Sequence, residues 1–101
     1  MLVYEVNLCV DGDVAEDMAT WLRDHIQDML AFDGFEGATW YQLDPEDGRQ
    51  RWTIHYRVAS WQPLNHYFEH HAPTVRQDGL DRFGGSFSAD RRVLYERESF
   101  A

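Results

Sequence analysis

Residues 51–58 read Arg-Trp-Thr-Ile-His-Tyr-Arg-Val, and their side chains alternate between polar and apolar without exception. This period of two is typical of a β-strand that buries one face, because successive side chains of a strand point to opposite sides. The apolar face should pack on a core and carries Trp52, Ile54, Tyr56 and Val58. The polar face should point away from that core and carries Arg51, Thr53, His55 and Arg57.

Residues 2–10 have the same period and predict a second strand of this kind. Its core-facing side chains are Tyr4, Val6, Leu8 and Val10. Its other face carries Val3, Glu5, Asn7 and Cys9. Further strands are expected over 35–43 and 86–96, and the turn formers at 44–48 should join the former to the strand over 50–59 as an antiparallel hairpin.

Two segments between the strands have helical periodicity. Asp13, with Glu16 three residues later, is typical of a capping box at a helix start, and Gly34 should end that helix. The apolar stripe of this helix is Val14, Met18, Trp21, Leu22, Ile26, Met29 and Leu30. Ser60 should cap a second helix, which Pro73 should interrupt before a further piece over 74–82. The buried side of the second helix is expected to contain Trp61, Leu64, Tyr67 or Phe68, and Ala72.

The element order is therefore strand, helix, strand, strand, helix, strand, and it predicts one α+β domain over residues 1–101. We expect a ferredoxin-like βαββαβ sandwich, in which a four-stranded antiparallel sheet carries both helices on one face. The other face must then meet solvent, a ligand or a second copy of the chain. Since an open sheet of this size leaves a large exposed patch and two edge strands, we predict a homodimer.

Composition excludes several classes of function. The 101 residues include 18 acidic and 9 basic side chains, a net charge of -9 that disfavours binding to nucleic acids and anionic membranes. All basic residues are Arg, which fits either a high-salt habitat or a GC-rich genome that encodes Arg in place of Lys. The single Cys9 allows no internal disulfide, and no apolar run is long enough to cross a membrane. We expect a cytoplasmic protein.

The polar sheet face is the first candidate site. If the first and third strands are neighbours, then Glu5, Asn7, His55 and Arg57 converge. His55 would serve as an acid or base and Arg57 would hold a polar or anionic ligand. The alternative is that Glu5 and Arg57 pair inside a dimer interface or on a solvated face.

Two further groups are weaker candidates. His66 and His70 share a helix face as metal ligands do, but no third ligand is evident, and we predict neither a metal nor another cofactor. Four arginines near the Gly84-Gly85 turn would suit an anion, or else would pair with Asp78, Asp81, Asp90 and Glu96. These arginines are Arg76, Arg82, Arg91 and Arg92.

Residues 71–87, His-Ala-Pro-Thr-Val-Arg-Gln-Asp-Gly-Leu-Asp-Arg-Phe-Gly-Gly-Ser-Phe, are followed by Arg-Arg-Val-Leu at 91–94. With Val-Tyr-Glu-Val at 3–6, Trp-Leu-Arg-Asp-His-Ile at 21–26 and Tyr-Arg at 56–57, this run resembles a small bacterial family known as domain of unknown function 4286. The resemblance implies a fold similar to that of the dimeric α+β barrel proteins, and it implies no particular activity or catalytic residue.

Two functions remain from the sequence. One is a homodimeric barrel that binds a small polar or anionic molecule in the sheet-face cleft, with or without turnover. The other is a non-catalytic interaction or regulatory module that uses the same sheet face to contact a protein.

Overall fold

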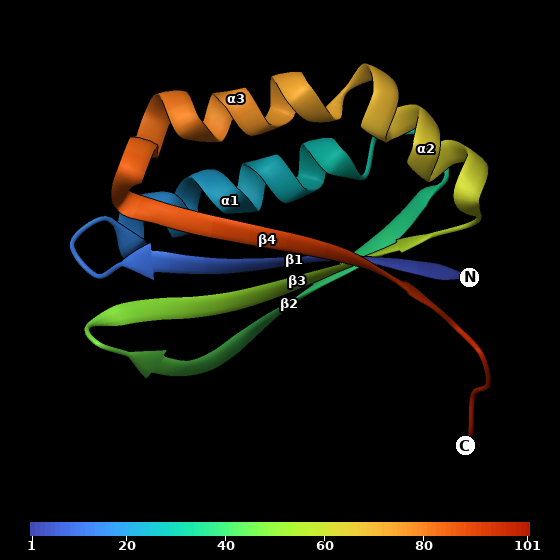
Figure 1. The fold of residues 1–101 in the computed structure, drawn as a ribbon, viewed down its shortest axis with the longest axis horizontal. Coiled ribbons are helices and arrows are strands. Elements are labelled where there is room, and N and C mark those ends of the chain that lie inside the picture. The colour runs from blue at the N-terminus through green and yellow to red at the C-terminus, as the bar shows by residue number, and fades with distance from the viewer.

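Four strands form one antiparallel sheet in the order β2-β3-β1-β4, with every helix on the same face (Figure 1). The computed structural model describes residues 1–101. The strands are β1 (Leu2–Asp11), β2 (Phe35–Glu46), β3 (Arg49–Val58) and β4 (Phe87–Tyr95). They are connected by α1 (Ala15–Met29), α2 (Trp61–His70), α3 (Ala72–Phe83) and the short 3₁₀ turn η1 (Gly84–Ser86). This is the expected ferredoxin-like α+β arrangement.

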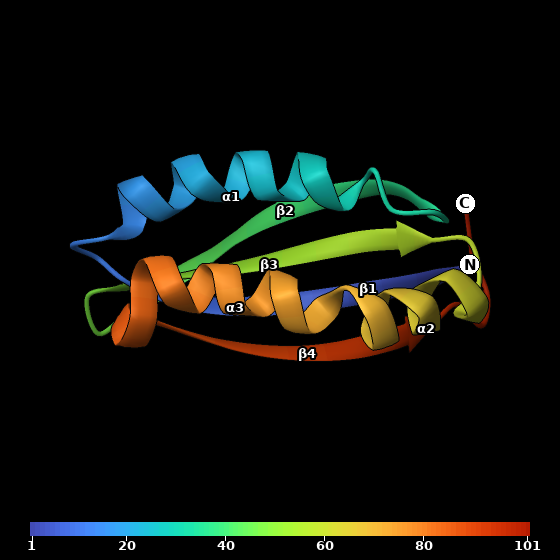
Figure 2. The same cartoon turned by 90° about the horizontal axis from the view of Figure 1, so that it is seen from above.

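The core lies between the sheet and the helices, and the period-two pattern predicts its sheet side correctly. Tyr4 pairs with Tyr56 and Leu8 with Trp52 across the two central strands, and all four side chains are buried. Seen from above, α1 runs along the β2 side of the sheet and α3 along the β4 side (Figure 2). The helices contribute Met18, Leu22, Met29, Leu64, Tyr67 and Ala72 to the same buried cluster.

The β2–β3 hairpin is tighter than expected. Instead of a five-residue turn, the strands continue to a two-residue turn at Asp47 and Gly48, whose φ angles are 52° and 74°. Positive φ at both central residues suits the right-handed twist of a hairpin, and Gly adopts it without strain. Pro45, which has no amide proton for the ladder, is accommodated because β2 is an edge strand with a register shift between Leu43 and Glu46.

The expected caps do not form. Neither Asp13 nor Ser60 makes a side-chain capping bond, and α1 begins at Ala15 instead. The amides of Val14 and Ala15 already donate to the carbonyls of Asp11 and Gly12, so the preceding turn satisfies the first amides of the helix.

The second helical region differs from expectation at its first residue. Trp61 is 46% exposed rather than buried; it is the first residue of α2, and the ring of Phe68 packs against it edge to face. The expected interruption of the second helix is confirmed, but it falls at His71: α2 ends at His70 and α3 starts at Ala72, so Pro73 lies in the first turn of α3. No helix has the length and apolar character needed to cross a membrane.

Candidate functional site

The open sheet face holds a polar network centred on Glu5, which is only 5% exposed although no helix covers it. Glu5 lies opposite His55 on β3 and opposite Arg92 on β4, so its two strand neighbours supply its partners. His55 Nε2 lies 2.8 Å from Glu5 Oε1, and Arg92 Nε donates to Oε2. Asn7 Nδ2 donates to Glu5 at 3.0 Å and to Asp90 at 2.9 Å.

These contacts decide the charge state of the network. The hydrogen bond from Arg92, followed by those from Asn7 and His55, outweighs burial and lowers the pKa of Glu5 from 4.5 to about 2. Since an ionised carboxylate can only accept, His55 Nε2 must donate to it. The acceptor sites of Glu5 are thus filled by protein donors. The network suits the joining of three strands better than proton transfer at neutral pH.

The pair between Glu5 and Arg57, considered above as the alternative to a ligand site, does not form. Arg57 lies opposite Val3, two residues away along β1, and Arg92 from the edge strand takes the position beside Glu5 instead. Arg57 Nη1 donates to Thr39 Oγ1 at 3.0 Å, and its guanidinium lies over Gly37, in the space that a side chain at that position would occupy. The structure therefore brings Glu5, Asn7 and His55 together and leaves Arg57 beside them. Ligand binding by these four residues stays a prediction.

The histidines at the end of α2 pack against neighbouring rings and do not converge as the ligands of a metal ion would. The rings of His66 and His70 lie 4.4 Å apart, and His71 stacks on Phe32 with 4.5 Å between ring centroids. No group of three or more His, Cys, Asp or Glu side chains is arranged to hold a metal ion.

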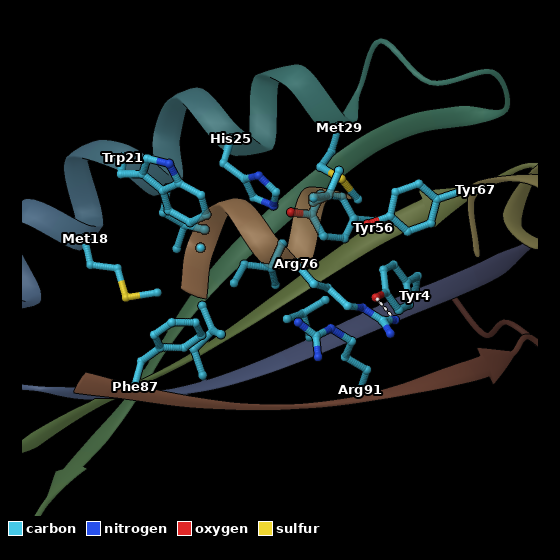
Figure 3. A pocket seen from close by; sticks show the side chains of 16 residues that line it. Tyr4, Met18, Trp21, His25, Met29, Tyr56, Tyr67, Arg76, Phe87 and Arg91 are labelled. Atoms are coloured by element: carbon cyan, nitrogen blue, oxygen red, sulfur yellow. Dashed lines mark hydrogen bonds between the residues drawn. The ribbon is translucent and has the colours of Figure 1, made fainter. Parts of the chain in front are cut away.

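A different cavity lies between the helices and the sheet, with a volume of about 50 Å³ (Figure 3). Side chains from all three α-helices and from the strands β1, β3 and β4 surround it, and most of them are apolar. Trp21 and His25 stack face to face on the α1 side, with 4.7 Å between ring centroids. The wall consists of Tyr4, Val6, Leu8, Met18, Trp21, Leu22, His25, Met29, Ile54, Tyr56, Tyr67, Val75, Arg76, Gly79, Phe87 and Arg91.

Several polar groups in this wall have no partner within the chain. No hydrogen bond within the protein engages the His25 ring or the Tyr56 and Tyr67 hydroxyls, yet none of their atoms is sealed from solvent without a partner. The Arg91 guanidinium also has no partner, but Arg91 is an exposed residue. These groups must therefore reach space that is open to water or to a ligand. Burial lowers the pKa of His25 below 6.5, so its imidazole is neutral at pH 7 and one ring nitrogen is an acceptor. Burial likewise raises the pKa of Tyr56 and of Tyr67, which keeps both as hydroxyl donors.

The cavity adjoins two outer hollows. One, of about 250 Å³, shares Tyr4, Arg76 and Arg91 with it and is completed by Phe68, Arg92 and Val93. The other, of about 550 Å³, shares Trp21 and His25 with it. This second hollow, between α1 and α3, is lined by the carboxylates of Asp17, Asp24, Asp28 and Asp78 and by Arg82, which pairs with Asp78. The cavity thus has an arginine-lined side and an acidic side.

Sequence reasoning missed this site. His25 follows Trp21 by four residues, so both lie on one helix face, and this spacing was the available signal. Of the four arginines near Gly84, Arg82 pairs with Asp78 as expected, whereas Arg92 pairs with Glu5 rather than with a neighbour in sequence. Arg76 and Arg91 pair with no carboxylate, and they line the cavity.

Residues 1–97 match the family model described as a domain of unknown function, DUF4286. The chain belongs to the DUF4286 family. No curated protein matches the sequence. The match covers both the sheet and the helices that enclose the cavity, so cavity and network lie within the length of the family domain.

Solved structures show that this family domain shares its fold with proteins of very different sequence. A candidate antibiotic biosynthesis monooxygenase from Deinococcus radiodurans superposes with a TM-score of 0.77 at 14% identity, covering 100% of this chain and 97% of that one. A mutant of SnoaB, a cofactor-independent oxygenase from Streptomyces nogalater, superposes with a TM-score of 0.66 at 15% identity, covering 97% of this chain and 95% of that one. MhuD, a haem degrader from Mycobacterium tuberculosis with two haems in its active site, superposes with a TM-score of 0.63 at 14% identity, covering 98% of this chain and 99% of that one. At such identities the likeness concerns the fold alone.

Proposed function

We propose that this DUF4286 protein binds a small, mostly apolar molecule in the cavity between its helices and its sheet. The observation that carries the proposal is the set of polar groups without protein partners in an otherwise apolar wall. A few polar groups converging on an apolar hollow are typical of a small-molecule site. The His25 imidazole and the Tyr56 and Tyr67 hydroxyls would orient the ligand, while the surrounding apolar side chains would hold its body.

The size of the cavity limits the ligand. A volume of about 50 Å³ holds a few water molecules, so a ligand body of about one ring must extend into the arginine-lined hollow or displace neighbouring side chains. Met18 and Met29 in the wall are flexible enough to yield. A haem, as bound by MhuD, is far larger than this space, so a smaller molecule is proposed here.

A substitution that fills the cavity tests the proposal. Gly79 on α3 borders it, and a side chain there would extend toward Trp21 and Phe87. We expect fluorine NMR titrations to show binding of 4-fluorobenzyl alcohol or 4-fluorobenzoate to the wild type and none to Gly79→Leu. Thr74→Leu, on the exposed face of the same helix, is the matched control and should bind as the wild type does. Equal binding by all three proteins would place the ligand elsewhere.

We further infer that the open sheet face packs against a second copy of the chain. Four strands of about ten residues present roughly 600 Å² of sheet, so two such faces would bury about 1,200 Å², the lower end of a specific interface. Tyr41 is 50% exposed on this face and meets His55 edge to face. The Glu5 network supports this proposal, because the Glu5 carboxylate is already hydrogen-bonded and almost fully shielded, so a partner can cover it with little further loss of hydration.

A further inference from the structure

Two arginines meet where α3 passes beside β4. Arg76 extends from α3 and Arg91 from β4, and both guanidinium groups reach into the space between helix and sheet (Figure 3). Arg91 lies opposite Val6 in the sheet, on the face that the helices cover. Both arginines line the cavity and also the adjoining hollow of about 250 Å³, so they stand at the boundary between the two.

Neither arginine has a carboxylate partner, although acidic residues outnumber basic ones 18 to 9. The only hydrogen bond of Arg76 runs to the Tyr4 hydroxyl at 3.3 Å, and Arg91 makes none. Of the other arginines, Arg49, Arg51, Arg82 and Arg92 each lie within 4.0 Å of a carboxylate, and Arg23, Arg57 and Arg97, none of which lines the cavity, do not. Arg76 and Arg91 are both exposed, so water solvates their guanidinium groups in the free protein, and an anion bound between them would be attracted by both charges.

The opposite side of the cavity carries the opposite charge. There, Trp21 and His25 separate the cavity from a groove with four carboxylates and one arginine, those of Asp17, Asp24, Asp28, Asp78 and Arg82. An anionic group would be repelled from that groove and attracted to the arginines. The charge distribution therefore defines one orientation for a ligand that has a charged end and an apolar end.

We propose that the ligand is a small apolar molecule with one carboxylate, which Arg76 and Arg91 bind while the apolar body occupies the cavity. This inference rests on the proposed function. Planar guanidinium groups bind carboxylates through paired, charge-assisted hydrogen bonds. Because the Tyr4 hydroxyl accepts from Arg76, its own proton stays available to donate to the same carboxylate.

Two probes of equal size separate charge from shape. Fluorine NMR titrations of the wild type with 4-fluorobenzoate and with 4-fluorobenzyl alcohol should give a dissociation constant at least tenfold lower for the acid. Raising the salt concentration should weaken binding of the acid and leave binding of the alcohol within twofold. This comparison needs no variant, so it stands even if a substitution impairs folding.

Substitutions then assign the effect to the arginines. Arg91→Met and Arg76→Met should each raise the dissociation constant of 4-fluorobenzoate about tenfold or more, with little effect on binding of the alcohol. Arg82 also lies on α3, but it pairs with Asp78 outside the cavity. Arg82→Met should therefore leave the affinity for both probes unchanged. Equal wild-type affinity for acid and alcohol, or unchanged acid binding in both arginine variants, overturns the carboxylate proposal. If the alcohol still binds and Gly79→Leu excludes it, the proposed function survives; if neither probe binds, both proposals fail.

Discussion

At the scale of single residues, Glu5 shows how a buried charge is tolerated on an uncovered sheet face. Its position in the central strand gives it a neighbour on each side, and both neighbours are hydrogen-bond donors. Asp90 is the only other acidic residue in this network, and it accepts a hydrogen bond from the same Asn7 amide as Glu5 does. Removing one donor would leave the carboxylate partly unsatisfied, whereas the intact network is stable.

Glu5 should therefore contribute a defined acid sensitivity. Because its folded-state pKa is lowered from 4.5 to about 2, its stabilising contribution is present above pH 4.5 and is lost as the pH falls through about 2. In thermal unfolding followed by circular dichroism, Glu5 alone should account for a loss of stability of at most about 1.4 kcal/mol per pH unit across this window. Glu5→Gln should flatten that slope, whereas Glu36→Gln, which changes an exposed carboxyl on β2, should not. A variant slope equal to that of the wild type would contradict this role for Glu5.

At the scale of elements, two glycines should respond differently to substitution by a larger residue. Gly34 follows α1 with φ of 81°, and a methyl group there would overlap Cβ and Cγ of Pro63. Gly79 lies inside α3 with an ordinary conformation, and a methyl group there would lie 3.4 Å from Trp21 and 3.6 Å from Phe87. The first glycine is needed by the backbone, and the second leaves space for the cavity.

Alanine substitutions should separate these roles. Gly34→Ala should destabilise the protein by more than about 1 kcal/mol, because it adds both a positive-φ penalty and a collision. Gly79→Ala should leave stability unchanged or raise it by up to about 1 kcal/mol, since Ala is the better helix former. Urea unfolding of both variants measures the difference. A Gly79→Ala protein as unstable as Gly34→Ala would mean that α3 packs more tightly on α1 than the structure shows.

The sequence predicts the sheet better than the site. Strict alternation along 51–58 assigns His55 to the open face and Tyr56 to the core without any knowledge of neighbours. The partner of Glu5 could not be predicted, because it depends on the register of β4, whose residues 87–95 alternate poorly. The cavity arises where Gly79 on α3 meets Trp21 on α1, and no local pattern encodes such a contact between distant elements.

At the scale of the whole molecule, one layer of helices leaves half of the sheet surface to be covered. We expect light scattering to give a mass of twice 11.9 kDa at about 100 μM, a concentration that populates a dimer with a micromolar dissociation constant. Tyr41→Glu on the open face should shift the protein toward the monomer. Tyr95→Glu, an exposed aromatic on the helix side of β4, is the matched control. A monomeric wild type at this concentration would rule out the sheet-face dimer.

The most direct test of the cavity as the binding site is to locate a bound probe. We would record amide and indole NMR spectra of the protein during titration with 4-fluorobenzoate. A ligand between helices and sheet predicts shifts at the Trp21 indole and at the amides of His25 and Gly79, with Asn7 and Thr53 on the open face unchanged. Shifts confined to Asn7, Thr53 and their strand neighbours would contradict the cavity and assign binding to the open sheet face instead.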